Sequence, residues 1–383
     1  MASQTSPVLG LRALNRATLA RQLLLYRDAE HRTTARAAVA RLVGLQAQNV
    51  KPPYYALAAR LHDFDPQELS ALMEAREVAR TVTLRSTIHT HTADDCLSLR
   101  PFAQPGGPER ELAVFAKRLD GVDLDRLAAV TRELLDERPR PIGDLRAALV
   151  AQWPDADPLA LTVAARCLLP LVQVTPRGLW GRSGQVTLTT AERWFGRAVE
   201  QAPSSDTMVL RYLAAFGPAS VKDMQTWSGL TRLRPAFDRL RPELLTFQDE
   251  KGVDLFDLPD APRPDPDTPA PPRFLPEFDN VLLSHADRSR IVPGDAKGRT
   301  WKGNQPYRVF LVDGFLAGIW QLDETADAAV LTVQSFGTLT RAERAALAEE
   351  GERLLTRMAP ATNRQVRFGQ FAQPVRARRA AGQ

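Results

Sequence analysis

A pattern of short helices followed by a strand–turn–strand segment occurs three times along this chain, and it is clearest over residues 207–258. Three helices are predicted there, over residues 207–216, 221–227 and 232–240. Ser220 and Thr231 are placed to cap the second and third of them, and Gly229 lies in the turn between them. Residues 244–258 then alternate as in a β-hairpin. This order is typical of a winged helix-turn-helix.

Two longer copies of the pattern precede this one. The first copy is preceded by a helix that Asn15 is expected to cap, and Asp65 is expected to start its last helix. Its predicted elements are helices over 34–45, 52–61 and 66–75 and one strand over 79–92. The predicted elements of the second copy are helices over 125–135, 142–153 and 157–169, followed by a wing with strands over 171–175 and 179–181. Internal repetition of this kind sets the architecture of a chain.

The remainder of the chain predicts a different kind of structure. Residues 259–276 contain eight prolines in eighteen residues, which is typical of an extended linker or a strap along the surface. Strands over 308–312, 316–322 and 329–336 are followed by a helix over 340–358, and the basic tail over 364–379 is expected to fray. The predicted fold class is α+β, with three tandem winged helix-turn-helix motifs and a small C-terminal antiparallel β domain. The predicted domains are 1–105 with the first motif, 106–202, 203–260, and 261–383 with the linker and the β-rich part.

Composition limits the classes of protein that remain. The two cysteines, Cys96 and Cys167, lie far apart in sequence, which argues against a disulfide framework or a structural zinc and fits a reducing cytoplasm. No stretch reaches 18 uninterrupted apolar residues, so neither a membrane span nor a signal peptide is predicted. The net charge of +5 permits nucleic-acid binding. A general bias of the composition toward Ala, Arg and Pro nevertheless explains most of the arginine content.

Two glutamines lie in the short connection that precedes Pro52-Pro53. Gly44 is a plausible helix stop, and the prolines fit the first turn of the next helix, so Gln46 and Gln48 are expected in a loop. In an extended loop, residues i and i+2 point the same way. Because each amide has donors and an acceptor, the pair could hold one water or one sugar. The alternative is that both amides cap backbone groups in a turn.

The strand predicted over 79–92 would bring more polar groups to the same place. Alternation puts Arg85, Thr87, His89 and His91 on one face, and the first three of them could line a cleft beside the glutamines. Two histidines at i and i+2 can bind a metal, but a third ligand is not evident in the sequence, so hydrogen bonding within the wing is favoured. Residues 294–298 lack the spacing of a phosphate-binding loop. Neither a metal nor a cofactor is therefore predicted.

Several basic residues are candidates for contacts with nucleic acid. Residues 294–304 are rich in glycine and basic side chains, which is typical of an exposed hairpin tip. The candidates are Lys51, Arg288, Lys297, Arg299 and Lys302. Asp287 and Arg288 either form a structural ion pair or face DNA together.

Four features of the sequence together resemble the AlkZ/YcaQ family of bacterial DNA glycosylases. They are the three repeats, the Gln46-Ala47-Gln48 loop, the Leu84-Arg85-Ser86-Thr87-Ile88-His89 segment, and the block from Phe278-Asp279-Asn280 to His285-Ala286-Asp287-Arg288-Ser289. The Gln-apolar-Gln form is similar to the AlkZ branch, which unhooks interstrand crosslinks made by azinomycin-type agents. The resemblance implies a monomeric, monofunctional DNA glycosylase that binds double-stranded DNA on a concave surface and hydrolyses the N-glycosidic bond of N7-alkylated or crosslinked purines. It further implies that Gln46 and Gln48 are catalytic.

The residues around that pair are expected to support it. Asn49, Arg85, Thr87 and His89 are the candidates for holding the two glutamines or their water. A neutral amide is a poor base, but an N7-alkylated purine is a cationic leaving group whose glycosidic bond is already weakened. Positioning a water is then most of what remains. The alternative function is a non-enzymatic winged-helix transcriptional regulator. A regulator usually carries one such motif per subunit and dimerises on a palindromic site, so three copies without a dimerisation helix favour the enzyme.

Overall fold

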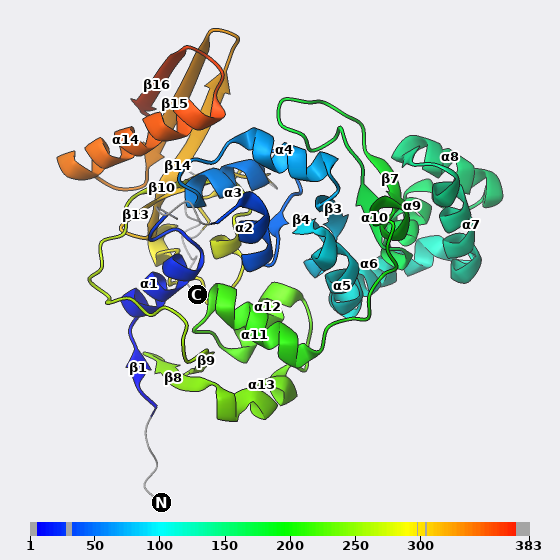
Figure 1. Cartoon of the computed structure of the whole chain (residues 1–383), viewed down its shortest axis with the longest axis horizontal. Coiled ribbons are helices and arrows are strands. Elements are labelled where there is room, and N and C mark those ends of the chain that lie inside the picture. The colour runs from blue at the N-terminus through cyan, green and yellow to red at the C-terminus, as the bar shows by residue number, and fades with distance from the viewer. Residues whose placement is uncertain (1–5, 28–32, 297, 303–304, 373–383) are drawn as a thin grey trace, which may run out of the picture.

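The structure is a computed structural model of the chain, and it describes residues 6–27, 33–296, 298–302 and 305–372. These residues form a mixed α+β fold that contains fourteen α-helices and several small sheets (Figure 1). Across the described ranges, every helix is too short or too polar to cross a membrane.

The first repeat surrounds the glutamine loop. It follows β1 (Val8–Leu9) and α1 (Leu11–Arg21). Its elements are α2 (Ala35–Arg41), β2 (Leu45–Gln46), α3 (Pro52–Arg60), α4 (Pro66–Glu74), β3 (Val78–Val82), β4 (Ile88–Thr92) and α5 (Ala93–Ala103). Asp65 caps α4, as predicted, through a side chain that accepts a backbone N–H. Strand β4 pairs with both β2 and β3, so the short strand lies against the second arm of the hairpin.

The second repeat has the same order of elements. It consists of α6 (Pro108–Phe115), α7 (Leu124–Glu137), β5 (Arg140–Pro141), α8 (Ile142–Gln152), α9 (Pro158–Leu168), β6 (Leu171–Gln173), β7 (Thr187–Thr190) and α10 (Ala191–Phe195). Asp157 caps α9 through a side chain that accepts the backbone N–H of Ala160. Strand β7 pairs with both β5 and β6, which repeats the arrangement of the first unit.

The third repeat is the most compact. It consists of α11 (Ser205–Phe216), α12 (Val221–Ser228), α13 (Arg234–Leu240), β8 (Leu245–Asp249) and β9 (Asp254–Asp257). Ser220 and Asp223 form a capping box at the start of α12, and Gly229 ends the helix with a φ of 78°. Ala219 bridges to Phe256 in β9, so again a segment before the second helix pairs with the second arm of the hairpin.

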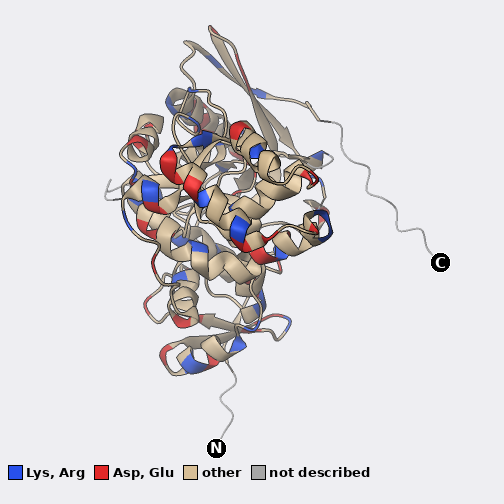
Figure 2. Cartoon of the chain, turned by 90° about the vertical axis from the view of Figure 1, so that its right-hand side faces the viewer, with Lys and Arg blue, Asp and Glu red and all other residues tan. Residues whose placement is uncertain are grey.

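One sheet joins the first two repeats. Its strand order is β2-β4-β3-β6-β7-β5, and the contact between repeats is the antiparallel pairing of β3 with β6. In Figure 1 the second repeat lies to the right of the first, and the third lies below it. Figure 2 faces the second repeat and shows that Lys and Arg are interspersed with Asp and Glu along its helices.

The C-terminal part forms a five-stranded sheet covered by one long helix. The sheet elements are β10 (Arg273–Leu275), β13 (Arg308–Val312), β14 (Phe315–Glu324), β15 (Ala328–Ser335) and β16 (Asn363–Phe368), and the helix is α14 (Arg341–Met358). A separate two-stranded hairpin is formed by β11 (Trp301–Lys302) and β12 (Gln305–Pro306). The first repeat and this sheet share one hydrophobic core, in which the rings of Tyr55 and Trp320 lie 5.5 Å apart.

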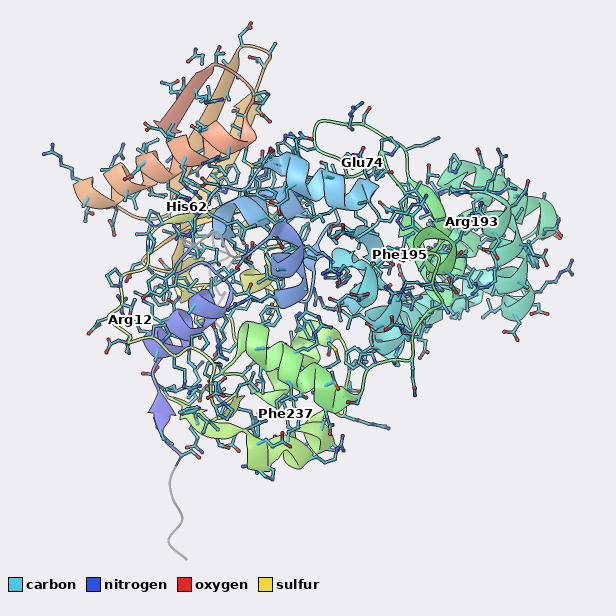
Figure 3. The ribbon with its side chains drawn as sticks, in the orientation of Figure 1. Arg12, His62, Glu74, Arg193, Phe195 and Phe237 are labelled. Carbon is cyan, nitrogen blue, oxygen red and sulfur yellow. The ribbon has the colours of Figure 1, made fainter. Side chains whose placement is uncertain are left out.

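Two buried ion pairs also fix the first repeat and the preceding helix α1 in place. Arg60 at the end of α3 donates to both carboxylate oxygens of Asp279 at 2.8 Å, and Arg21 at the end of α1 donates to Asp257 in β9. All four side chains are fully buried. Removing one partner would leave an uncompensated buried charge, which costs about 3–5 kcal/mol. His62, labelled in Figure 3, follows α3 at the end away from the glutamine loop.

Some predictions about local structure were wrong. Asn15 lies inside α1 instead of capping it, because Gly10 is the N-cap residue. The Asn15 amide donates to the carbonyl oxygens of Arg290 and Gly314, which belong to a distant part of the chain. Leu233, not Thr231, occupies the N-cap position of α13.

The wing of the second repeat was also placed wrongly. Its second strand is β7, not residues 179–181. Residues 179–181 are drawn away because Trp180 packs against Tyr54 and Tyr55, with ring centroids 5.0 and 5.9 Å apart. Tyr54 also donates its hydroxyl to the carbonyl oxygen of Gly178 at 2.6 Å. Tertiary packing therefore outweighs the local turn signal.

The C-terminal sheet is mixed instead of purely antiparallel. β16 pairs in parallel with β15, and it is formed by part of the tail that was predicted to fray. Residues 373–379 of that tail lie outside the described residues. The last residues of the proline-rich segment form the edge strand β10.

Candidate active site

The glutamine loop is held against β4 by backbone pairing. Gln46 belongs to β2 and lies opposite His89, and Ala47 donates its N–H to the carbonyl oxygen of Ile88 at 2.7 Å. Gly44 makes the sharp turn from α2 into β2 with a φ of 88°, and a Cβ there would lie 2.3 Å from the ring of His91. Only glycine fits this position, because it tolerates both the backbone conformation and the close approach.

Both glutamine amides turn their oxygens toward the β3–β4 hairpin. Gln46 is buried, and its Oε1 accepts from Nη2 of Arg85 at 3.2 Å. Gln48 is exposed, and its Oε1 accepts from the backbone N–H of Ile88 at 3.3 Å. Guanidinium and backbone N–H groups can only donate, so these contacts fix which end of each amide faces the hairpin. Neither Nε2 donates to any residue in the described part of the chain.

These contacts bear on both interpretations of the loop. The structure brings Gln46 and Gln48 to the same hairpin, as an extended loop predicts. Gln48 nevertheless caps a backbone group, as the alternative predicts. A carbonyl oxygen has two lone pairs, so each Oε1 keeps one acceptor position after these bonds form. Each amide can therefore still bind one further polar group.

The single strand predicted over 79–92 is instead a hairpin. β3 ends at Val82, and the chain reverses through a 3-10 turn over Leu84–Ser86 before β4 begins at Ile88. Arg85 and Ser86 have φ values of 54° and 57°, a left-handed conformation that ends the alternation on which the prediction relied. Thr87 donates its hydroxyl to the carbonyl oxygen of Leu84, so it stabilises the turn.

Arg85 links the glutamine loop to the third repeat. Its Nη2 donates to Gln46, and its Nη1 donates to the carbonyl oxygen of Trp227 in the last turn of α12. Burial and, to a smaller extent, the nearby charge of Arg288 together lower the pKa of Arg85 to about 10. The guanidinium therefore remains charged at neutral pH and is held in place by partners on two different repeats.

His89 and His91 form a buried pair behind the loop. The hydroxyl of Thr83 lies 3.2 Å from Nδ1 of His89 and 2.9 Å from Nε2 of His91, and the two rings stack 5.5 Å apart. Burial lowers the pKa of His91 to about 4 and that of His89 well below its usual value. Both rings are therefore neutral at physiological pH. Within the described residues, no group of three His, Cys, Asp or Glu is arranged to bind a metal.

The two candidates that follow the glutamines are bound to acidic residues. Asn49 donates to Oε1 of Glu277 at 3.0 Å. Lys51 was predicted to contact nucleic acid, but its ammonium pairs with Glu324 at 3.3 Å and lies over the ring of Trp180. Asn49 thus fastens the loop to the segment before Phe278.

The other basic candidates differ in how accessible they are. Arg288 is exposed, and Asp287 pairs with Lys251 instead of with Arg288. Lys302 is exposed on β11. The β11–β12 hairpin begins at Trp301 and covers fewer residues than the tip predicted over 294–304. Arg299 is half-buried with its guanidinium 4.0 Å from the ring of Phe336, so it is not at an exposed tip. Lys297 lies outside the described residues.

Three residues that hold the loop were not singled out from the sequence for that role. Arg80 is buried in β3 and donates to the carbonyl oxygen of Ala47 at 2.7 Å, and burial lowers its pKa to about 10. Asn280 donates to the carbonyl oxygens of Leu42 and Gly44, and Glu277 accepts from Asn49. An arginine within a β-branched strand and the Glu277–Asn280 block were the signals available, but neither indicates a partner in the loop.

A shallow groove runs beside Arg85, between the hairpin turn and α12. It has a volume of about 690 Å³. Arg85, Arg110 and Lys222 contribute positive charge to it, while Glu111 contributes a single negative charge. Gly229 lies at its floor, where a Cβ would meet the carbonyl oxygen of Gly106 at 2.6 Å. The first and third repeats therefore approach each other closely beside the candidate site.

Comparisons with known proteins identify the fold and the family. The solved structure of the Streptomyces sahachiroi DNA glycosylase AlkZ is similar, with a TM-score of 0.76 and 20% identity over 94% of this chain and 100% of that one. A search of curated proteins gives no match. The family described as DNA glycosylase AlkZ-like matches residues 39–357, which span most of the chain. This chain therefore belongs to the AlkZ-like family of DNA glycosylases.

Proposed function

We propose that the enzyme is a monofunctional glycosylase that hydrolyses the N-glycosidic bond of N7-alkylated purines, including purines in interstrand crosslinks, for DNA repair or self-resistance. The observation that carries this proposal is the set of contacts made by the two glutamines. Both Oε1 atoms face one hairpin, and neither side chain contacts a carboxylate among the described residues. A site without a strong base suits a substrate that already has a good leaving group.

Gln46 and Gln48 are the proposed catalytic residues, and their role is to position the attacking water. The free Nε2 groups can donate to the water, and the remaining lone pair of each Oε1 can accept from it. The water attacks C1′ as the alkylated purine departs with the electron pair of the glycosidic bond, and the departing purine loses its positive charge. The new C1′ hydroxyl then releases the extra proton of the attacking water to bulk solvent. Holding the water in the correct geometry supplies most of the rate enhancement in this scheme.

Arg85 is proposed to position Gln46, and the hydroxyl-bridged histidines His89 and His91 are proposed to hold β4 in register with the loop. Thr87 and Asn49 act indirectly. Thr87 fixes the hairpin turn, and Asn49 fixes the far end of the loop. A rigid frame matters because displacement of a catalytic group by about 1 Å can cost about 10²-fold in rate. In this scheme the buried histidines act as neutral hydrogen-bonding groups and do not transfer protons.

The three repeats are proposed to be winged helix-turn-helix motifs that bind double-stranded DNA as a monomer. The support is their shared topology, in which a segment before the second helix pairs with the second arm of the hairpin each time. The groove that contains Arg85, Arg110 and Lys222 is a candidate path for the phosphate backbone. A shallow groove suits a crosslinked purine, because its tether to the opposite strand prevents full rotation into a deep pocket.

Release of the modified base from defined duplexes tests this proposal. A duplex that contains one N7-methylguanine is incubated with the enzyme and then cleaved with alkali at abasic sites. Cleavage at that position is expected, while matched duplexes with unmodified guanine or with uracil remain intact. A second duplex with an N7-linked interstrand crosslink should release one strand under denaturing conditions. Cleavage of the uracil duplex, or of neither modified duplex, would overturn the proposed substrate class.

A further inference from the structure

A small cavity lies where the first two repeats meet through β3 and β6. Its polar lining consists mainly of the side chains of Arg80, Gln173, Arg177 and Trp194. The centre of a water-sized particle has about 10 Å³ in which to lie, so the cavity takes one small particle and excludes an organic ligand. Among the described residues, none that lines it is acidic. The function proposed above makes no use of this cavity.

The lining residues carry an excess of hydrogen-bond donors. Five of their buried polar atoms make no hydrogen bond within the described ranges, namely Nε and Nη1 of Arg80, Nε of Arg177, Nε1 of Trp194 and Oε1 of Gln173. Guanidinium and indole N–H groups can only donate, so four of these atoms are donors and one is an acceptor. A buried donor that lacks a partner destabilises the fold, and such a cluster therefore indicates a bound group that accepts hydrogen bonds.

The backbone brings these side chains together. Arg80 and Gln173 are direct partners in the antiparallel pairing of β3 with β6. Side chains of directly opposite residues lie on the same face of a sheet, with Cβ atoms about 4.5–5.5 Å apart. The chain next to Arg177 packs on the same guanidinium side chain, since a Cβ at Gly178 would lie 2.9 Å from Cδ of Arg80.

The two arginines bring positive charge that no acidic side chain balances. Arg80 is only 2% exposed, and its Nη2 donates to the carbonyl oxygen of Ala47. Arg177 donates from Nη1 to the carbonyl oxygen of Gly184. Neither arginine pairs with an Asp or Glu in the part of the chain that the structure describes. Burial and, to a smaller extent, the charge of Arg177 lower the pKa of Arg80 to about 10, so Arg80 remains charged at neutral pH. Buried charges of this kind require a counter-charge.

We infer that the cavity binds one chloride ion between the guanidinium groups of Arg80 and Arg177. A monatomic anion matches the size of the cavity and can accept from every donor in the set. A buried water typically makes about three hydrogen bonds and has to donate some of them, so it cannot satisfy four donors. A flip of the Gln173 amide turns its NH₂ group toward the ion and removes the one acceptor from the set. This site does not depend on the reaction proposed for the glutamine loop.

The bound ion connects the two repeats and supports the loop. Arg80 belongs to the first repeat, whereas Arg177 and Trp194 belong to the second, so the ion links two units that share one sheet. The Arg80 guanidinium also holds the carbonyl oxygen of Ala47, which lies between the two glutamines. Chloride is therefore expected to stabilise the fold as a structural ion.

Thermal melting in sodium chloride and in sodium gluconate at equal ionic strength tests the site. Gluconate is an anion too large for a cavity of this size. Arg177→Met removes one donor and one positive charge from the lining. Trp194→Phe removes only the indole N–H and keeps an aromatic ring beneath the guanidinium of Arg76, which lies 4.4 Å from the ring centroid.

Two further variants complete the set. Arg193→Met is the matched control for Arg177→Met. Arg193, labelled in Figure 3, is exposed and does not line the cavity, and its guanidinium also donates to backbone carbonyl oxygens, those of Asp136 and Glu137. Gln173→Glu supplies a carboxylate directly opposite Arg80, which takes the place of the ion.

The wild type and Arg193→Met should melt at a temperature about 1–3 °C higher in chloride than in gluconate, as expected for a ligand well above its Kd on a chain of this size. This difference should be reduced in Trp194→Phe and lost in Arg177→Met. Gln173→Glu should melt in gluconate about as high as the wild type does in chloride, without a further response to chloride. Anomalous scattering from bromide in crystals of the wild type should give one peak between Arg80 and Arg177.

Three results would overturn the inference. An equal response to chloride in the wild type and in every variant would show that the cavity holds water. A cavity without a bromide peak would show that the ion is absent. A bromide peak without any chloride effect on melting would mean binding at crystal concentration only. If Arg177→Met fails to fold, Trp194→Phe and Gln173→Glu decide, because each keeps a side chain of nearly the original size.

Discussion

Gln46 and Gln48 have different surroundings although they are two residues apart. Gln46 is buried against a charged guanidinium, whereas Gln48 is exposed and bonded to a backbone N–H. The sequence predicted that the two amides would lie together, and the structure confirms their common orientation toward the hairpin. It could not predict the partner of Gln46, because Arg85 reaches it only after an unexpected reversal of the chain at residues 84–86.

Arg85 provides a prediction about positioning. Arg85→Ala should lower the single-turnover rate of N7-methylguanine release by about tenfold or more, because a hydrogen bond to a charged group contributes about 1.5–3 kcal/mol. Arg85→Lys should not restore the rate, since one ammonium cannot reach both Gln46 and Trp227. The matched control is Arg110→Ala in the same groove, which should weaken DNA binding but leave the rate at saturation unchanged. Equal effects of both variants on binding alone would contradict the assignment.

The buried histidines provide a prediction about pH. An unfolded histidine has a pKa near about 6.5, whereas burial lowers the pKa of folded His91 to about 4. Between these values the unfolded chain binds more protons, so the free energy of unfolding falls as pH drops, by about 1.4 kcal/mol per pH unit for this one group. The free energy of unfolding is measured by urea titration at several pH values from 7 to 4. Its decrease per pH unit should be smaller for His91→Gln than for the wild type by this amount. An unchanged slope would mean that His91 is already charged in the folded state.

At the scale of elements, the sequence predicted structure best where the signals are local. Ser220 and Asp65 cap α12 and α4 as expected, since a cap needs only a side chain and a backbone N–H two or three residues away. Elements that depend on distant partners were missed. The polar strand β16 forms because β15 offers a free edge, and β7 replaces the predicted strand because Trp180 packs against the first repeat.

The turn before β2 provides a prediction at this scale. Gly44→Ala should lower both the melting temperature and the rate of base release, because a Cβ at this position would collide with the His91 ring and the backbone has a positive φ. Gly143→Ala is the matched control. Gly143 lies within α8, and a Cβ there meets nothing within 4 Å. The control should be neutral or stabilising by up to about 1 kcal/mol. A Gly44→Ala variant with wild-type stability and rate would show that the loop needs no such turn.

At the scale of the whole molecule, the sequence predicted the α+β class and the order of the repeats, because helix spacing and turn residues recur three times. It did not predict how the repeats assemble. The first two share a sheet through β3 and β6, and the first shares its core with the C-terminal sheet. These contacts join segments that lie far apart in sequence. The candidate site is a product of this assembly, since Arg85 reaches from the first repeat to the third.

The assembled surface provides a prediction about DNA binding. If about five phosphates are neutralised, the logarithm of the association constant should fall against the logarithm of salt concentration with a slope of roughly −4 to −5. Little preference among unmodified sequences is expected, because contacts to phosphates carry no sequence information. Fluorescence anisotropy across a salt series measures both properties. A flat response, or a strong preference for one palindrome, would instead indicate a transcriptional regulator.

The most direct test of the account is single-turnover release of N7-methylguanine by Gln46→Ala and Gln48→Ala. Each variant should melt and bind DNA almost as the wild type does but release base more slowly, by a factor near the lower end of the 10²–10⁴ typical of a positioned group, since the cationic base leaves readily. The double variant should lose less transition-state stabilisation than the sum of the losses in the two single variants, because both amides hold the same water. Gln48→Asp should keep activity on this substrate. If both alanine variants release the base at the wild-type rate, the loop is structural and the catalytic assignment is wrong.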